Sequence, residues 1–398
     1  MKRKVFFICL FIIIPLLSIS QENEYETKWE QGYKFNSSDG HFKMKFGGRI
    51  MNDWAFFSQE EDVQDKTGKI NNGTEFRRVR VFNSGTIYNN INYKLQLGFA
   101  GGTVKAKDLY IEITDIPVAG NLKIGHYKEP FSLEKLTSSK YISFMERSSA
   151  SAFAPGRNTG FLLHNETKQS RLSWQIGMFT NANDFGNNKN INDYYSYTAR
   201  IAGLPFQKND KKQLLHTGIG VTYRQGMSGP YSFSARPEAH LAEKYVNTGD
   251  IEEVQNVFQY NTELAYVSGP LALQGEFYQS AVTTNSSDSY KFHGGYGQIS
   301  YLITGENKSY KNPGGGFGRI KPNENFGGEK NGTGAWEVAV RYSMIDLNDH
   351  NGGKMNEVTA GLNWYLNPSV RIMANYGIVT LHDIGKTDIL QLRFQIDF

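Results

Sequence analysis

Histidine is the side chain in this sequence that can take part in the widest range of chemistry, because imidazole binds metals and acts as a general base near neutral pH. No histidine has a partner at His-x-x-x-His or Glu-x-x-His spacing, which would place two metal ligands on one helix face. The histidines are scattered at His41, His126, His164, His216, His240, His293, His350 and His382. No serine and histidine are marked as a hydrolase pair. We therefore expect no metal site, no cofactor and no enzymatic activity.

A glycine-rich stretch at 313–318 could cradle a phosphate group through backbone N–H groups. A phosphate loop, however, continues with Lys-Ser or Lys-Thr and leads into a helix. Neither feature follows these glycines, so we interpret the stretch as part of a long connection at 305–333. Other long connections are expected at 128–158 and 226–253. Loops of this length in a compact domain are usually functional.

Charged side chains at alternate positions are the stronger chemical signal. In the segment 42–57 the even positions carry Phe42, Met44, Phe46, Ile50, Trp54 and Phe56, whereas the odd positions carry Lys43, Lys45, Arg49 and Asp53. Because alternate side chains of a strand point to opposite faces, one face of this segment is apolar and the other is charged. A charged face of this kind could line a channel, and cationic rings select anions.

The segments that carry such residues are predicted to be strands of a membrane barrel. No apolar run after residue 21 is long enough for a membrane-spanning helix, so a membrane role requires a closed barrel. The fold class is therefore all-β, a transmembrane antiparallel β-barrel of about 16 strands. The predicted strands are 42–57, 74–87, 91–100, 106–115, 121–127, 159–165, 171–180, 194–204, 213–225, 254–267, 271–281, 292–304, 334–345, 356–366, 369–379 and 388–398. Tight turns are expected at 89–90, 268–270 and 367–368.

The last predicted strand ends on Phe398, the final residue of the chain. A terminal aromatic residue on an alternating strand resembles the sorting signal that the barrel-assembly machinery of the outer membrane recognises. The alternative is the edge strand of a soluble sandwich in a secreted β protein that binds a ligand. Such sandwiches do not repeat long strands with many aromatic residues at their ends.

Residues 1–20 have the pattern of a signal peptide, with Lys2, Arg3 and Lys4 before an apolar run and small residues at its end. Cleavage after Ser20 would lower the formal charge from +4 to +1, which argues against a nucleic-acid partner. Cleavage would also remove Cys9, the one cysteine of the chain. We expect residues 21–41 to form an N-terminal periplasmic segment and 42–398 the barrel.

Several motifs together resemble the phosphate-selective porins of the O and P type, which are sixteen-stranded trimeric outer-membrane channels. The resemblance covers most of the chain after residue 20. The motifs are Phe46-Gly47-Gly48-Arg49-Ile50, Phe76-Arg77-Arg78-Val79-Arg80, Lys107-Asp108-Leu109-Tyr110-Ile111, the run 125–134, Phe144-Met145-Glu146-Arg147, Ala335-Trp336-Glu337 with Arg341-Tyr342-Ser343, and the run 361–368.

The resemblance implies a pore constriction built from wall arginines and from the loop 128–158, folded into the barrel. By matching motifs, the wall arginines are Arg49, Arg77 and Arg78, the acidic partner is Asp108, and the loop contributes Ser139, Lys140 and Arg147. Guanidinium groups suit this role because their paired N–H donors match tetrahedral oxyanions. A nearby carboxylate would hold the arginines in place and let the ion leave.

Two points about this constriction stay open from the sequence. Arg77 and Arg78 are adjacent, so strict alternation admits one of them to the lumen and leaves the other to snorkel at the interface. The second point is whether the lumen lining has a net positive charge. Its predicted face carries the lysines Lys43, Lys45, Lys94 and Lys123 but also the acids Asp53, Glu112 and Glu337. The lysines are then either part of an anion path or part of a mixed solvated lining.

The expected function is a passive channel for small anions, phosphate or polyphosphate, in the outer membrane of a Gram-negative bacterium. The expected partners are the anions, outer-membrane lipid, the barrel-assembly machinery and two further copies in a homotrimer. The alternative function is a weakly selective porin for small polar solutes.

Overall fold

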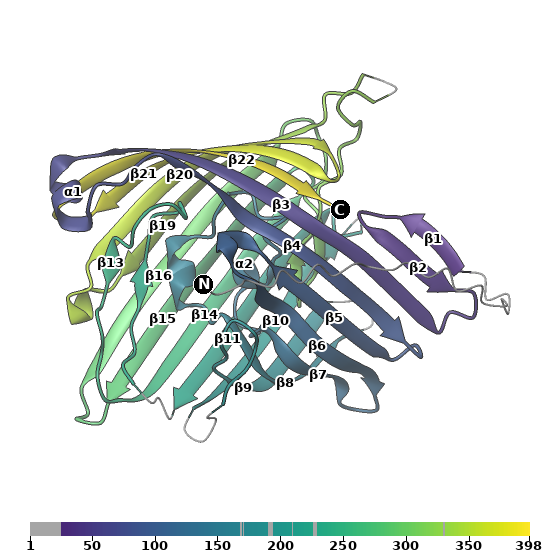
Figure 1. Ribbon diagram of the computed structural model, residues 1–398, viewed down its shortest axis with the longest axis horizontal. Helices are drawn as coiled ribbons and strands as arrows, with labels where there is room; N and C mark the ends of the chain where they lie inside the picture. The colour runs from purple at the N-terminus through teal and green to yellow at the C-terminus, as the bar shows by residue number, and fades with distance from the viewer. Residues whose placement is uncertain are drawn as a thin grey trace, which may run out of the picture.

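Sixteen long strands close into one antiparallel barrel in the computed structural model (Figure 1). The structure describes residues 25–398 except 168, 170, 190–193, 209, 226–228 and 329–330. The first eight strands are β3 (Phe42–Gln59), β4 (Gly73–Ile87), β5 (Ile91–Gly98), β6 (Lys105–Ile116), β7 (Gly120–Lys128), β8 (Arg157–Glu166), β9 (Leu172–Thr180) and β10 (Tyr195–Lys208). The others are β11 (Gln213–Gln225), β14 (Val254–Ser268), β15 (Leu271–Thr284), β16 (Ser289–Leu302), β19 (Ala335–Asp346), β20 (Lys354–Asn367), β21 (Val370–Leu381) and β22 (Gly385–Asp397).

The predicted fold class and strand number are confirmed. Each strand pairs with its neighbour along the chain, and β22 pairs with β3 to close the sheet, from Thr387 opposite Gln59 to Asp397 opposite Arg49. Apolar side chains of alternate residues cover the outside, as in Trp54, Phe161 and Leu264. Period-two alternation therefore predicts the strands because lipid selects apolar side chains on one face only.

The terminal Phe398 completes the closure of the barrel against β3. Its N–H donates to the carbonyl of Gly48 at 3.1 Å, and the Gly48 N–H donates to the Phe398 carbonyl at 2.6 Å. The Phe398 ring lies over Gly48, where a Cβ would stand only 2.8 Å from a ring carbon. Glycine at this position thus allows the ring of Phe398 to pack closely against the first barrel strand.

A short hairpin precedes the barrel and extends its wall. Its strands are β1 (Tyr25–Trp29) and β2 (Tyr33–Ser37), and β2 pairs with β3 from Tyr33 opposite Phe46 to Asn36 opposite Lys43. The hairpin thus occupies the edge of β3 beyond the end of β22, visible at the right of Figure 1. The predicted signal peptide, residues 1–20, lies outside the described residues.

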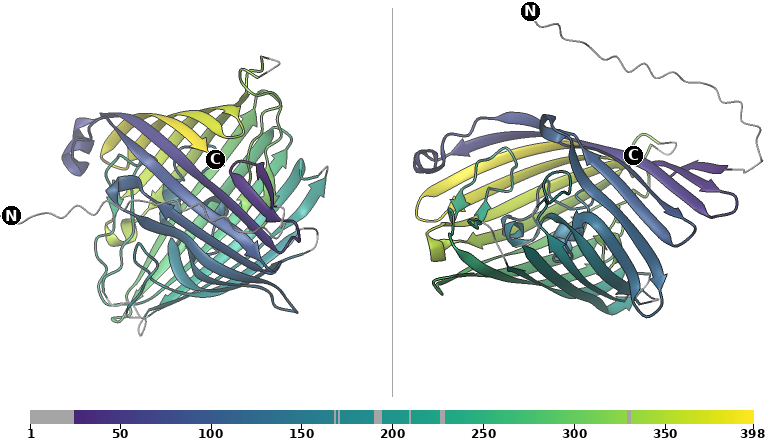
Figure 2. Two further views of the ribbon diagram at one scale, coloured as in Figure 1. Left: turned by 45° about the vertical axis from the view of Figure 1, so that its right-hand side comes forward. Right: turned by 60° about the horizontal axis from the view of Figure 1, so that its bottom comes forward.

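The two ends of the barrel differ in their connections. One end, here called the turn end, has short turns at 88–90, 269–270 and 368–369, where the sequence predicts them. The other, the loop end, carries longer connections such as 60–72 and 226–253 (Figure 2). One long connection, 303–334, also belongs to the turn end, because like the short turns it follows an even-numbered strand of the barrel, as in the predicted strand order.

The connections contain only short elements. The helical turns are α1 (Glu61–Thr67), α2 (Leu133–Leu136), η1 (Ala100–Gly102), η2 (Ser149–Phe153) and η3 (Asn348–His350). Two small hairpins are formed by β12 (Ser234–Ala235) with β13 (Val246–Asn247), and by β17 (Tyr310–Asn312) with β18 (Gly316–Phe317). In the described part of the chain, no helix is long and apolar enough to cross a membrane.

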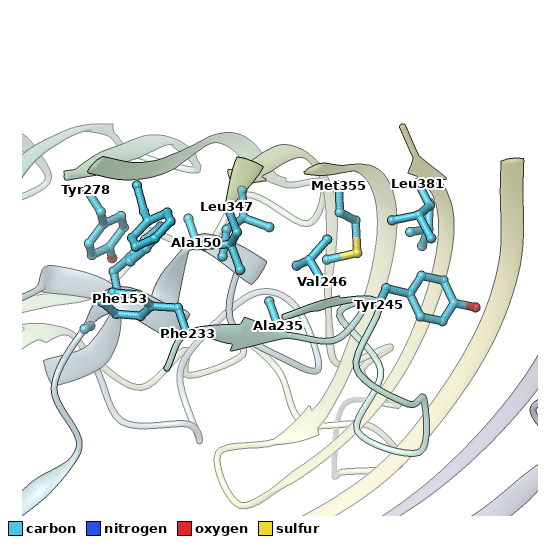
Figure 3. Close-up of a cluster of buried hydrophobic side chains, with 14 of the residues drawn as sticks. Ala150, Phe153, Phe233, Ala235, Tyr245, Val246, Tyr278, Leu347, Met355 and Leu381 are labelled. Atoms are coloured by element: carbon cyan, nitrogen blue, oxygen red, sulfur yellow. The ribbon is translucent and has the colours of Figure 1, made fainter. Parts of the chain in front are cut away.

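An apolar core lies inside the barrel near the loop end (Figure 3). The segment 226–253 contributes Phe233 and Val246, η2 contributes Phe153, and the wall contributes Tyr278 and Met355, among others. Here the inward positions of the wall are apolar instead of charged, because they pack against protein and not water. The side of the lumen next to β14 to β22 is therefore filled with protein. Any passage must follow the opposite wall, formed by β3 to β9.

Candidate functional site

The segment 129–156 between β7 and β8, here called the crossing segment, crosses the lumen and is anchored on the opposite wall. Ser143 Oγ donates to Glu337 of β19 at 2.9 Å, and Arg371 of β21 donates to the carbonyl of Ile142 at 2.8 Å. Glu134 accepts from Ser148 and from Arg341 of β19. The wall partners have almost no solvent exposure. This segment therefore has a fixed path inside the barrel.

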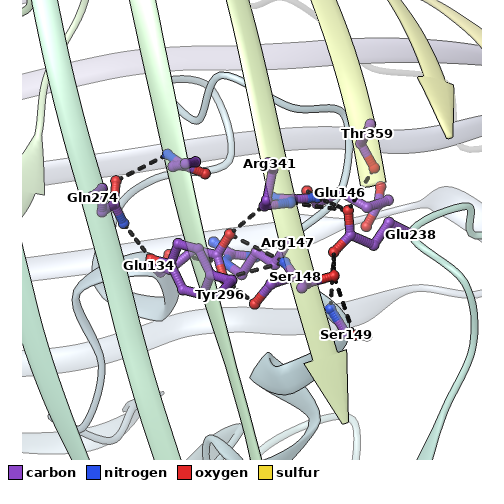
Figure 4. Close-up of polar contacts among 12 residues, drawn as sticks. Glu134, Glu146, Arg147, Ser148, Ser149, Glu238, Gln274, Tyr296, Arg341 and Thr359 are labelled. Atoms are coloured by element: carbon purple, nitrogen blue, oxygen red, sulfur yellow. Dashed lines mark hydrogen bonds and ion pairs between the residues drawn. The ribbon is translucent and has the colours of Figure 1, made fainter. Parts of the chain in front are cut away.

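A second set of contacts joins this segment to the connection 226–253 (Figure 4). Glu238 accepts hydrogen bonds from the Ser149 N–H at 3.1 Å, from Ser343 Oγ at 2.6 Å and from Arg341 Nε at 2.9 Å. Arg341 therefore lies between Glu238 and Glu134, one carboxylate from each connection. Breaking such a buried pair from one side is costly, because it leaves an uncompensated charge.

The turn-end connection 303–334 also enters the barrel. Lys308 Nζ donates to Glu337 at 2.5 Å and to Ser143 at 2.7 Å, and Arg319 pairs with Asp397 of β22. Three connections thus fill the side of the barrel formed by β14 to β22. Buried glutamates of that wall serve as their anchors and do not face a water path.

The opposite side, formed by β3 to β9, encloses a cavity of about 280 Å³, here called the basic chamber. Among the described residues that line it, eight are cationic and one, Asp108, is a carboxylate. The wall supplies Arg49, Arg78, Arg80, Lys94, Lys123 and Arg157, and the chain from the end of β7 into the crossing segment supplies Lys128 and Arg147. The charges of the lumen are therefore segregated, although the whole chain is nearly neutral.

Arg49 and Arg80 form the centre of the chamber on the wall side. They stand directly opposite each other across β3 and β4, an arrangement that is destabilising for like charges unless an anion compensates them. Arg49 Nη1 donates to Ser139 Oγ at 3.0 Å and lies 3.5 Å from Ser138 Oγ. The guanidinium of Arg80 has no hydrogen bond or ion pair to any residue that the structure describes.

The side chain of Arg80 also borders a second cavity, which it shares with Lys107. The two side chains meet over Gly98 of β5, where an added Cβ would lie 3.0 Å from Lys107 Cε and 3.8 Å from Arg80 Cγ. Both cations line a neighbouring cavity of about 360 Å³ toward the loop end. Gly98 thus makes room for two positive side chains side by side.

Asp108 is placed in the basic chamber, but its partners are not the predicted wall arginines. Its carboxylate accepts from Lys94 Nζ at 2.6 Å and from Arg157 Nε at 2.9 Å. It therefore neutralises part of the charge contributed by β5 and β8. Arg49, Arg77 and Arg78 make no hydrogen bond or ion pair with it in the described structure.

A β-bulge answers the open question about Arg77 and Arg78. Met51 of β3 lies opposite Arg78, and the next residue, Asn52, lies opposite Phe76, so Arg77 is an extra residue on β4. A bulge of this kind redirects side chains and breaks strict alternation. Both arginines consequently line a cavity of about 380 Å³, here called the loop-end chamber.

Glu146 of the crossing segment is the carboxylate that meets these arginines. It accepts from Arg77 Nε at 2.8 Å and Nη2 at 2.9 Å, lies 3.6 Å from Arg78 and pairs with Arg393 of β22 at 2.9 Å. Burial alone would raise the pKa of Glu146, but Arg77, Arg78 and Arg393 hold it well below its usual range. Glu146 is therefore charged at every physiological pH.

Arg147 lies at the boundary between chambers. It donates to the carbonyls of Glu134 and Thr137 at 2.9 Å each and has no carboxylate partner within the described ranges. Arg78 and Arg147 are the two residues that line both the loop-end chamber and the basic chamber. They mark the place where one chamber opens into the other.

The basic chamber continues toward the turn end. Tyr110 lines both it and a cavity of about 480 Å³, here called the turn-end chamber. Lys43 and Lys45 line this chamber together with Lys28 and Lys34 of the hairpin. The three chambers thus follow one wall of the barrel from the loop end to the turn end.

All of the predicted site residues except Lys140 line one or more of the three chambers. Arg49, Arg78, Asp108, Ser139, Arg147, Lys94 and Lys123 line the basic chamber, Arg77 lines the loop-end chamber, and Lys43 and Lys45 line the turn-end chamber. Lys140 lines none of the three. Its Nζ pairs with Asp397 at 2.9 Å.

Sequence reasoning missed Arg80, Lys128 and Arg157. Arg80 could have been found, because it follows Arg78 by two residues and therefore shares its face. Lys128 and Arg157 flank the crossing segment, and no local pattern reports where such flanking residues point. Lys128 donates to the carbonyl of Lys135, at the end of α2.

No cluster of three or more His, Cys, Asp and Glu suitable for a metal ion occurs among the described residues. His216 illustrates the structural use of histidine here, since its ring lies between Tyr310 Oη at 2.6 Å and Glu263 at 2.9 Å, fully buried.

Two lysines of the crossing segment predict a pH dependence of ion selectivity. Burial lowers the pKa of Lys135 to about 8, with Arg147 and Arg157 adding to the effect. Burial also lowers the pKa of Lys140 to about 8, although its ion pair with Asp397 opposes the shift. Both are cationic below that value and lose their charge as the pH rises through it. We expect the ratio of anion to cation permeability, measured from reversal potentials, to fall between about pH 7 and about pH 9.

Lys135→Arg with Lys140→Arg is the matched variant for this test, because a guanidinium keeps its charge over the whole range. Its permeability ratio should stay level where that of the unaltered protein falls. Equal pH profiles for the two proteins would assign the titration to other groups.

The family model for phosphate-selective porin O and P matches residues 44–398. Porin O of Pseudomonas aeruginosa is 25% identical over 387 residues, which cover 88% of this chain and 85% of that protein. An anion-selective porin from Comamonas acidovorans has a similar structure, with a TM-score of 0.60, 11% identity and coverage of 90% of this chain and 100% of that one. OmpT of Vibrio cholerae in its trimer form has a TM-score of 0.55 at 10% identity, covering 89% of this chain and 99% of that one.

Proposed function

Because the chain belongs to the phosphate-selective porin O and P family and is an outer-membrane porin, we propose that it conducts small anions passively, with phosphate as the principal class of cargo. The observation that carries this proposal is the basic chamber, where eight cationic side chains meet one carboxylate. Cationic linings select anions. Phosphate suits the chamber because guanidinium forks and serine hydroxyls can donate to several oxygens of one tetrahedral ion.

The proposed path enters at the loop end and leaves at the turn end. It runs through the loop-end chamber, past Arg78 and Arg147, through the basic chamber and out over Lys43 and Lys45. In this proposal the turn end faces the periplasm, and Arg49, Arg78, Asp108, Ser139 and Arg147 form the constriction. The family and the barrel fold favour a channel over an enzyme.

We further propose a homotrimer, on the ground that porins of this fold include a trimer form. Lipid contact over the apolar outer face and recognition of the last strand by the barrel-assembly machinery remain predictions from the sequence.

Block of chloride current by phosphate tests the proposed cargo. In a planar bilayer bathed in chloride, added phosphate should reduce the current in a saturable way, because a tightly held ion occupies the passage. Sulfate, which has the same geometry, serves as the comparison ion. A current that falls only in proportion to the phosphate fraction would favour the alternative of a weakly selective porin for small polar solutes.

A further inference from the structure

Glu146 and Glu238 are the two carboxylates among the described residues that line the loop-end chamber. Of the two, Glu146 is the one that contacts the wall arginines Arg77 and Arg78. Its side chain is 14% exposed, while those of Arg77 and Arg78 are 19% and 6% exposed. It therefore reaches the passage and is not enclosed in the filled half of the barrel.

The geometry separates two effects of Glu146. Its two oxygens face Nε and Nη2 of Arg77, a bidentate arrangement that fixes the plane of that guanidinium. The contact to Arg78 is a longer one, at 3.6 Å, and engages Nη1 only. Arg77 is thus held, whereas Arg78 stays only partly compensated at the boundary of the basic chamber.

Arg393 has a carboxylate partner of its own and so does not take the charge of Glu146 away from Arg77 and Arg78. Its guanidinium is completely buried and is bidentate with Asp53, at 2.6 Å for both contacts. That pair is neutral, so the second contact of Arg393 to Glu146 tethers the crossing segment to β22. The negative charge of Glu146 acts mainly on Arg77 and Arg78.

We propose that Glu146 is a positioning residue that orients Arg77 and weakens the hold of Arg78 on a passing anion, so that the ion is admitted and then released. This inference rests on the proposed function. A conducting site must bind an ion well enough to admit it and weakly enough to let it leave. Removing the carboxylate would leave the anion as the main counter-charge of Arg78, which lines the basic chamber, whereas Arg77 does not line it.

Glu146→Gln tests the proposal, because the amide keeps the size of the side chain and one acceptor oxygen but removes the charge. We expect phosphate to block chloride current at concentrations about tenfold lower than in the unaltered protein, and the saturating phosphate current to fall. If Glu146 only holds the crossing segment in place, the variant should instead show a larger conductance and a weaker phosphate block. That result, or an unchanged block, would overturn the proposal.

Glu134→Gln is the matched control, since Glu134 lies in the same crossing segment but lines none of the three chambers and pairs with Arg341 and Ser148 instead of Arg77 and Arg78. It should leave the phosphate block unchanged. In the double variant Glu146→Gln with Arg78→Gln, the added affinity should disappear, because it depends on Arg78. Persistence of the tighter block in that double variant would also overturn the proposal.

Glu146→Asp provides a second route if Glu146→Gln does not assemble. It keeps the charge but shortens the reach, so Arg77 loses its bidentate contact and block should change far less than with the neutral side chain. A block by Glu146→Asp that is about tenfold tighter would overturn the role of the charge. If the unaltered protein shows no phosphate block at all, the proposed function fails, which is distinguishable from failure of this inference.

Discussion

Replacing Arg49 or Arg80 by Ala should weaken phosphate block of chloride current about tenfold or more and lower the anion preference of the channel. The two residues stand opposite each other on β3 and β4, and neither has a hydrogen bond or ion pair to a carboxylate among the described residues. Each guanidinium offers several N–H donors to an oxyanion. A charge-assisted hydrogen bond contributes about 1.5 to 3 kcal/mol, which corresponds to roughly ten- to a hundredfold in affinity. Single-channel currents with and without phosphate measure the effect.

Lys at either position should restore most of the anion preference but only part of the block, because an ammonium lacks the planar fork. Lys43→Ala is the control, since Lys43 lines the turn-end chamber and not the basic chamber. It should change conductance modestly through its field alone. Undiminished selectivity and block in both arginine variants would remove these residues from the constriction.

Deleting the middle of the crossing segment, residues 138–147, should increase conductance severalfold and abolish most of the ion selectivity. The deletion removes Ser138, Ser139 and Arg147 from the basic chamber and releases Arg77 from Glu146. The barrel should still assemble, because its strands pair with one another and its apolar outer face is unchanged. Single-channel conductance, read beside a gel test for the heat-stable folded barrel, measures the result.

The increase should nevertheless stop short of a fully open barrel. The connection 226–253 keeps its apolar contacts with β14 to β22, and 303–334 keeps the pair between Arg319 and Asp397. Unchanged conductance after the deletion would mean that ions do not pass beside this segment.

The strands could be predicted because every barrel strand has one face in lipid, and that requirement leaves a period of two in the sequence. The bulge at Arg77 could not, since it depends on the register between β3 and β4. The filling of the lumen next to β14 to β22 could not be predicted from the sequence either. Glu337 has the pattern of a solvated lumen residue in the sequence, yet in the structure it binds Lys308, Ser143 and Tyr365.

The basic chamber was predictable in part. Motif matching indicated Arg49, Arg78 and Asp108, and all three line it. The partners of Asp108 depend on how β5, β6 and β8 are aligned, which a single sequence does not report. The position of Lys140 depends on the path of the crossing segment, which brings it to Asp397 at the end of β22.

The reversal potential of the unaltered protein in a potassium chloride gradient tests the central claim most directly. The basic chamber predicts a potential close to that of an ideal chloride-selective membrane, and a smaller potential when the salt concentration is raised on both sides, since salt screens the charged lining. A reversal potential near zero, or one of the sign for potassium, would contradict an anion path along β3 to β9.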